Sequence, residues 1–316
     1  MTPVTPVPQK PPVPPERGDD IALARRFEEH RGHLRAVAYR MLGSLAEAED
    51  AVQETWLRLA RTDAPDTIAN LGGWLTTVTG RICLDLLRSR TARREQPIDE
   101  TFVPDPVLRP LPGPDDPEHQ ALRADSVGVA LLVVLERLAP DERLAFVLHD
   151  LFAVPFDDIA PVVDRSPAAT RQLASRARRR VRDAEPASDP DPGRQKEVLD
   201  AFMAASRGGD FDALVAVLHP DVVLRADAGA LVRGAAASKA LRGARPVAES
   251  ALLFARYNAA ARTVLVNDAL GLISVDDDGT VRSVMSVTVA DGRITGMYIL
   301  ADPARLERLA VPPGQG

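Results

Sequence analysis

The distribution of proline divides this chain before any other feature does. The 27 prolines among 316 residues cluster in short stretches that separate segments with regular apolar periodicity. Proline removes a backbone donor and disfavours helix at the preceding residue, so each stretch interrupts regular structure. A single compact core is therefore not expected, and the chain is predicted to fold as two or three modules.

The predicted class is multidomain, with two all-α modules, the second a helix-turn-helix, followed by an α+β domain. Between and around these modules lie proline-rich linkers and tails, of which the first is expected to be disordered. The predicted divisions are a tail at residues 1–18, a helical module at 19–95, an extended linker at 96–117, a helical module at 118–184, a linker at 185–193, the α+β domain at 194–303 and a tail at 304–316.

Composition and charge exclude several classes of protein. The net charge of −6 argues against a basic coat, and any nucleic-acid contact must be local, as in the six arginines between Arg171 and Arg182. No stretch approaches the ~18 apolar residues of a membrane span, and the N-terminus does not resemble a signal peptide, so a cytoplasmic protein is expected. The single cysteine, Cys83, is predicted to be a buried thiol without a role.

The first helical module is predicted to contain three helices. Apolar residues recur at spacings of three and four up to Leu42, and Ser44 with Glu47 forms a capping box for a second helix. A loop with Gly72-Gly73 follows, and a third helix is predicted from near Trp74, with an apolar face of four residues: Leu75, Val78, Ile82 and Leu86.

The second helical module ends in a helix-turn-helix pattern. Residues 156–163 are predicted to be the supporting helix, shortened or bent by Pro161, and Ser166-Pro167 opens the recognition helix. Asp164 can supply the left-handed turn in place of glycine. Side chains early in such a helix reach base edges, and later arginines contact phosphates. The alternative is a solvated, arginine-rich helix end.

The C-terminal domain is predicted to begin with two helices divided near Gly208-Gly209. Asp278-Gly279 and Asp291-Gly292 are hairpin signals in the antiparallel meander that follows. The predicted strands are residues 222–226, 251–257, 263–267, 271–276, 281–289 and 294–300.

Two long stretches resemble the sigma-70 family of RNA polymerase subunits. YRMLGSLAEAEDAVQETWLRL and GWLTTVTGRICLDLLRSRTARRE resemble regions 2.1 to 2.4, and LAPDERLAFVLHDLFAVPFDDIAPVVDRSPAATRQLASRARRRVR resembles region 4. The short linker between them is typical of the extracytoplasmic-function group. The resemblance implies a factor that binds core polymerase and promoter DNA and directs transcription initiation.

The resemblance also assigns three surfaces. The polar face of the second helix is expected to dock on core polymerase: Asp50, Gln53, Glu54 and Leu57. One side of the third helix is expected to read the −10 element: Trp74, Thr77, Arg81, Asp85 and Arg88. The loop at residues 67–73 is expected to hold a flipped base, although Trp74 at a helix start more often packs into a core. The recognition helix is expected to read the −35 element: Ser166, Ala168, Ala169, Thr170, Arg171, Gln172, Ser175, Arg176, Arg178 and Arg179.

The C-terminal domain resembles the SnoaL-like, ketosteroid-isomerase-type cone fold, which a subgroup of these sigma factors carries. In that subgroup a linker motif is thought to meet a glycine-rich element of the cone and so regulate activity. The corresponding residues here are Phe102, Pro104, Asp105 and Pro106 in the linker and Asp227 and Gly229 in the cone. Two glycines and the lysine of the glycine-rich element are absent from this chain.

Two other functions remain as alternatives. A conventional helix-turn-helix regulator with a ligand-sensing C-terminal domain would bind duplex DNA unaided. A cone enzyme would need an acid or base in an apolar pocket, and the candidates His219, Asp221, Asp227 and Tyr257 show no catalytic spacing. No enzyme activity, cofactor or metal site is predicted; an anti-sigma partner is left open.

Overall fold

A computed structural model describes residues 17–62, 65–92, 101–111, 128–184, 191–229, 232, 234, 237–255, 261–276 and 278–312. The predicted N-terminal tail lies almost wholly outside these residues, as do residues 96–100 and 112–117 of the first linker, residues 118–127 of the second helical module, and Tyr257.

The first module consists of α1 (Arg17–Leu42), α2 (Leu45–Ala60), a short 3₁₀ turn (Pro65–Thr67) and α3 (Leu71–Ala92). The predicted cap is confirmed, because Ser44 Oγ accepts a hydrogen bond from the Glu47 backbone N–H at 3.5 Å. The predicted start of the third helix was wrong. Asn70 Oδ1 accepts the backbone N–H of Gly73 at 3.0 Å, so Asn70 caps a helix that already includes Gly72-Gly73.

The apolar face of α3 is also rotated from its predicted position. Leu86 was expected to be buried, but its side chain is 39% exposed. Thr79, Cys83 and Leu87 face the interior instead, at successive spacings of four residues.

The second module contains α5 (Val129–Glu136), α6 (Pro140–Phe146), a π-helical turn (Val147–Leu151), α7 (Phe156–Ile159) and α8 (Pro167–Ala184). Asp164 has φ of +54°, as the predicted turn required. The supporting helix ends at Ile159, before Pro161, which has no N–H to continue it. Ser166 Oγ accepts from the Ala169 N–H at 3.2 Å and caps α8 as predicted.

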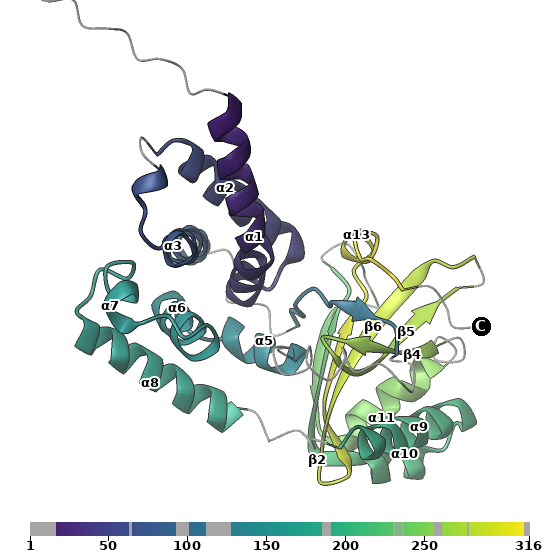
Figure 1. The fold of residues 1–316 in the computed structure, drawn as a ribbon. Helices are drawn as coiled ribbons and strands as arrows, with labels where there is room; N and C mark the ends of the chain where they lie inside the picture. Colours follow the sequence, from purple (N-terminus) through teal and green to yellow (C-terminus); the bar gives the residue numbers. More distant parts are fainter. Residues whose placement is uncertain are drawn as a thin grey trace, which may run out of the picture.

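The two helical modules share one hydrophobic core. Val37, Met41 and Leu84 of the first module pack in a single buried cluster with Leu132 and Leu148 of the second. At Gly80 of α3 a side chain would meet the ends of Leu144 and Leu148 at 3.2 and 3.1 Å, so the helices approach closely there. Figure 1 shows α3 directly above α6 and α8 below both.

The C-terminal domain packs helices against a mixed sheet. Its elements are α9 (Pro192–Gly208), α10 (Phe211–Val217), β2 (Leu218–Asp227), β3 (Lys239–Arg242), α11 (Ala244–Leu253), β4 (Ala261–Val266), β5 (Ala269–Val275), β6 (Val281–Ala290), β7 (Arg293–Leu300) and α13 (Pro303–Leu306). Over the described residues the strand order is β1-β4-β5-β6-β7-β2-β3, in which β1 (Leu108–Arg109) comes from the first linker. In Figure 1, α9, α10 and α11 lie together near one end of the sheet and α13 near the other.

Two details of this domain differ from prediction. The strand expected at residues 251–257 begins inside α11, which ends at Leu253 and buries Val247 and Ala251 at a helical spacing of four; residues 256–257 lie outside the described residues. The sheet is not purely antiparallel, because β2 pairs in parallel with β7. The hairpin at Asp291-Gly292 is confirmed: both residues have positive φ, at +51° and +70°, between antiparallel β6 and β7.

Described residues of the first linker and of the C-terminal tail form regular structure that was not predicted. Part of the supposed tether forms β1 (Leu108–Arg109), which adds an edge strand to the sheet by pairing with β4. The supposed C-terminal tail begins with α13, whose Leu306 is buried. No helix among the described residues is long and apolar enough to cross a membrane.

Candidate functional site

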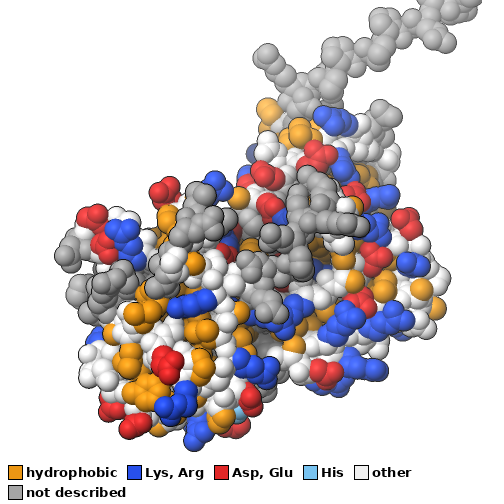
Figure 2. Space-filling model, turned by 180° about the vertical axis from the view of Figure 1, so that it is seen from behind, with side chains coloured by type: hydrophobic (Ala, Val, Ile, Leu, Met, Phe, Trp, Pro, Cys, Tyr) orange, Lys and Arg blue, Asp and Glu red, His pale blue; other side chains and the backbone are white. Residues whose placement is uncertain are grey.

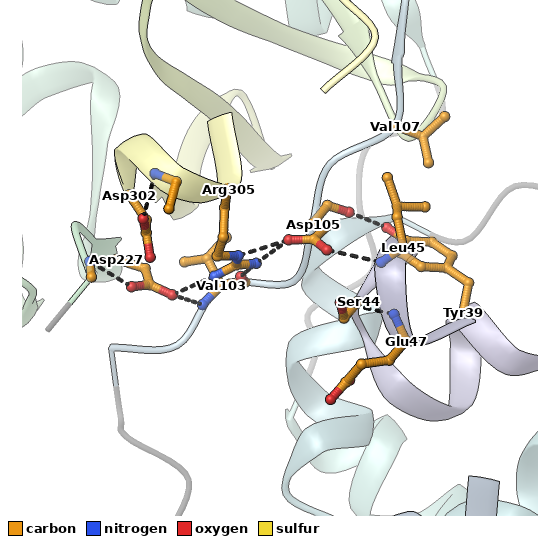
Figure 3. Close-up of polar contacts among 12 residues, drawn as sticks. Tyr39, Ser44, Leu45, Glu47, Val103, Asp105, Val107, Asp227, Asp302 and Arg305 are labelled. Carbon is orange, nitrogen blue, oxygen red and sulfur yellow. Dashed lines mark hydrogen bonds and ion pairs between the residues drawn. The ribbon is translucent and has the colours of Figure 1, made fainter. Parts of the chain in front are cut away.

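Besides the pairing of β1 with β4, Arg305 of α13 joins the linker to the C-terminal domain. Arg305 donates to Asp105 Oδ1 through Nε at 2.7 Å, to Asp227 Oδ2 through Nη1 at 2.7 Å and to the Val103 carbonyl through Nη2 at 2.6 Å. Its guanidinium also lies over the Phe102 ring, 5.2 Å from the centroid. We call these five residues the Arg305 junction, of which Figure 3 labels Val103, Asp105, Asp227 and Arg305.

The Arg305 junction reaches the first helical module through the other atoms of Asp105. Asp105 Oδ2 accepts from the Leu45 N–H at 2.8 Å, and the Asp105 N–H donates to the Gly43 carbonyl at 2.9 Å. Tyr39 donates its hydroxyl to the Asp105 carbonyl, and Asn267 of the C-terminal domain donates to the Tyr39 hydroxyl at 3.1 Å. The linker is therefore held between the α1–α2 turn and the cone (Figure 3).

The junction lies largely out of water. Asp105 and Asp227 are each 8% exposed, and the Arg305 side chain is 20% exposed. One guanidinium serves two carboxylates, whose other contacts are backbone N–H groups: Leu45 for Asp105, Gly229 and Val103 for Asp227. Burial raises the pKa of Tyr39, which stays a neutral donor. Such an arrangement is stable only while every partner is present.

The predicted regulatory residues come together here. Phe102 and Asp105 meet Asp227 through Arg305, and Pro104 and Pro106 are buried beside them. Gly229 has φ of +76°, and a Cβ on it would come within 2.6 Å of an Asp302 carboxylate oxygen, so glycine alone fits.

Sequence reasoning missed Arg305 because it assigned residue 304 onward to a tail. The available signal was Asp302-Pro303, an N-cap residue followed by proline, which predicts a helix start. Asp302 Oδ1 indeed accepts from the Ala304 N–H at 2.9 Å.

The expected polymerase-docking residues share one face of α2. Asp50, Gln53 and Leu57 are exposed, and Glu54 is half-buried in an ion pair with Arg58 at 3.1 Å. Asp50 also borders a groove that is lined by Arg305 of α13 and by Arg308, which follows that helix. The C-terminal domain thus stands beside the start of this face.

The expected −10 residues follow one side of α3, but they are not equally free. Arg81 and Asp85 are exposed, whereas Trp74 is partly buried against the cluster that contains Leu71 and Leu75. Thr77 donates its hydroxyl to the Gly73 carbonyl at 2.5 Å. Arg88 donates twice to Asp141 Oδ1 of α6, at 3.1 and 2.8 Å, and is engaged with the second module.

The expected −35 residues lie on α8 or at its N-cap, and all but Ala169 and Thr170 are exposed. Thr170 is fully buried, and its hydroxyl donates to the Ser166 carbonyl at 3.0 Å; its assignment to base contact was wrong, because its side chain is not on the surface. Ala169 is half-buried. The remaining predicted residues are exposed: Ser166, Ala168, Arg171, Gln172, Ser175, Arg176, Arg178 and Arg179.

Two of these arginines have partners within the module. Arg178 pairs with Asp150 at 2.5 Å, and Arg171 lies over the Phe156 ring, 5.2 Å from its centroid. On the face drawn in Figure 2, Lys and Arg side chains are frequent over the helical part of the molecule, at the right, whereas hydrophobic side chains are more frequent over the C-terminal domain at the lower left.

The candidate catalytic residues are not gathered in one site among those described. His219 Nδ1 accepts from the Asp221 N–H at 3.1 Å in an exposed contact, and Asp227 belongs to the Arg305 junction.

The chain is similar to sigma factors along most of its length. Residues 26–93 match sigma-70 region 2, and residues 128–181 match sigma-70 region 4. The ECF RNA polymerase sigma factor SigJ of Mycobacterium tuberculosis is 43% identical over 311 residues, covering 92% of this chain and 97% of that one. The probable ECF sigma factor SigI of the same species is 35% identical over 302 residues, covering 94% and 99%.

A solved structure shows the same architecture, including the C-terminal cone. The crystal structure of the Mycobacterium tuberculosis extracytoplasmic function sigma factor SigJ superposes with a TM-score of 0.70 at 38% identity, covering 92% of this chain and 100% of that chain.

Proposed function

Because this chain belongs to the ECF RNA polymerase sigma factors, we propose that its SnoaL-like C-terminal domain holds the sigma regions in a closed state through the Arg305 junction. Core polymerase and promoter DNA are the partners that the family implies. In the proposal, the face of α2 docks on core polymerase, exposed residues of α3 read the −10 element, and those of α8 read the −35 element.

The shared core of the two sigma regions supports a closed state. Elements centred about 25 base pairs apart are separated by roughly 85 Å of duplex, at about 3.4 Å per base pair. A compact body of roughly 160 residues has a diameter of about 40 Å. Since α3 and α8 belong to one such body, they must separate before both elements are bound.

The ion pair between Arg88 and Asp141 supports the same conclusion. This pair joins α3 to α6, and it occupies a guanidinium assigned to the −10 element. Separation of the modules would release Arg88 for a promoter strand. The pair is partly exposed, with side chains 40% and 24% accessible, so it adds little resistance to opening.

The Arg305 junction supplies the stronger restraint, and it carries the proposal. It fixes the linker between the sigma regions to the cone at one end and to the α1–α2 turn at the other. Opening the sigma regions requires the linker to move, and polymerase docking at Asp50 requires space next to α13. Both requirements oppose the intact junction.

Transcription in vitro tests this function. Purified core polymerase and fragmented genomic DNA would be supplied with the full chain, with Arg305→Met, or with Arg293→Met, an exposed arginine at the start of β7. We expect discrete new transcripts from the full chain, more from Arg305→Met, and no change from Arg293→Met. If Arg305→Met is no more active than the full chain, the junction does not restrain the factor. If none yields promoter-specific transcripts, the assignments of α3 and α8 fail.

A further inference from the structure

The C-terminal domain encloses an apolar cavity that the proposed closed state does not use. Its volume is about 240 Å³, and it lies between the sheet and helices α9 and α11. Most of its lining is hydrophobic: Phe202, Ala226, Leu272, Met285, Met297 and Ile299. An apolar cavity of about 150 Å³ holds benzene, so this one has room for roughly ten non-hydrogen atoms.

The cavity lining includes one cation for which the described residues supply no carboxylate partner. Lys239, on β3, has its Nζ 4.2 Å from the centroid of the Phe254 ring. Burial lowers the pKa of its ammonium, and among the described residues no carboxylate pairs with it. The other basic residue of the described lining, Arg282, is paired with Asp276.

The other polar groups of the lining suit a singly charged ligand. They include the hydroxyls of Ser250 and Ser283, which can donate to an oxygen without adding charge. A single ammonium beside hydroxyls balances one negative charge, whereas a phosphate dianion would keep an unpaired charge in an apolar site. The described lining contains no acidic residue that would attract a cation.

We propose that this cavity binds a small organic carboxylate with an apolar body, Lys239 pairing with the carboxylate and the sheet and helices enclosing the body. The ligand matches the lining on each count: its apolar part leaves water, and its charge meets the ammonium near Phe254.

The cavity also touches the Arg305 junction. Ala226 and Ala228 line the cavity, and Asp227 between them belongs to the junction. Ala301 lines the cavity too, and its N–H donates to the Asp227 carbonyl at 2.7 Å. A ligand that shifts the end of β2 thus acts directly on Asp227. This coupling rests on the proposed function of the junction; the binding of a carboxylate does not.

Calorimetric titration of the full chain with octanoate, which has ten non-hydrogen atoms, tests the binding. The probes for comparison are 1-octanol and octylamine, which keep the chain but remove or reverse the charge. We expect octanoate to bind at least 10-fold more tightly than either. Lys239→Met should weaken the binding of octanoate about 10-fold or more, because it removes the charge that pairs with the carboxylate; a tenfold loss of affinity corresponds to about 1.4 kcal/mol. The same variant should keep its affinity for octanol within about 2-fold.

Lys196→Met is the matched control, because Lys196 is an exposed lysine paired with Asp200 on α9. It should bind octanoate like the unaltered chain. Ala251→Leu, which fills the cavity from α11, should abolish binding of both octanoate and octanol. Absence of octanoate binding at millimolar concentration, equal binding of octanol by the unaltered chain, or an unchanged affinity in Lys239→Met would each overturn the proposal. The first two outcomes need no variant.

The coupling has its own measurement. Octanoate added to the transcription assay should change the output of the full chain but not that of Arg305→Met, whose junction is already broken. If octanoate binds as expected and output does not change, the coupling is wrong and the binding site stands. Whether the junction restrains the factor at all is decided by Arg305→Met without ligand.

Discussion

Replacement of Arg305 by methionine isolates the restraint that the C-terminal domain places on the sigma regions. Methionine keeps much of the aliphatic volume but leaves Asp105 and Asp227, each 8% exposed, without their cation. Removing one partner of a buried ion pair costs about 3–5 kcal/mol. Because Arg305 is 20% exposed and both carboxylates keep backbone donors, we expect about 2–4 kcal/mol.

This free energy is lost from the closed state alone, so it should reappear as affinity for core polymerase. An energy of about 2–4 kcal/mol corresponds to a factor of roughly 30 to 700. Two assays check it: equilibrium binding of labelled protein to core polymerase, and urea unfolding of the free chain. Arg305→Met should bind more tightly and unfold at lower urea, whereas Arg293→Met should match the unaltered chain.

The comparison of the two assays decides the role of the junction. If stability falls by the expected amount while affinity for core polymerase is unchanged, the junction is a structural contact and not a restraint, and the reasoning above is refuted. A double-mutant cycle with Asp105→Asn should recover most of the coupling, because the two side chains are in direct contact.

Three further predictions concern other parts of the molecule. Gln172→Ala, at an exposed position of α8, should weaken holoenzyme binding to −35 DNA by about 1–3 kcal/mol and relax specificity there, whereas a loss that is equal on all sequences would contradict base contact. The His33 ring hydrogen-bonds to the Thr76 hydroxyl and packs against the Phe152 ring. Burial lowers the pKa of His33, and the charges of His30 and Arg40 lower it further. The unfolded state therefore takes up its proton first as pH falls through about 6.5, so unfolding free energy should decrease from pH 7.5 to 5.5, and His33→Gln should flatten that decrease in urea titrations. Burial raises the pKa of Cys83 to about 12, so a disulfide reagent should label it in urea but hardly at all in the native protein at pH 8; rapid native labelling would show that the shared core opens.

Local features of the chain could be predicted because they depend on neighbours in sequence. The Ser44 cap, the positive φ of Asp164 and the Asp291-Gly292 hairpin are properties of a few consecutive residues, and all three are present. The failures at the end of α11 and the start of α3 have a related cause. A short apolar run such as the end of α11 is compatible with both strand and helix. The start of α3 depends on the hydrogen bond from the Gly73 N–H to the Asn70 side chain.

The sequence by itself determined the order of the modules, the two sigma regions and the residues along the exposed sides of α2, α3 and α8. Tertiary structure alone decided which of those residues are free: Thr170 is buried, and Arg88 is bound to Asp141. It also brought Asp105, Asp227 and Arg305 into one junction across separations of 78 to 200 residues. The physical reason is that periodicity specifies a face of a helix, whereas the partner of that face depends on how distant segments of the chain pack together.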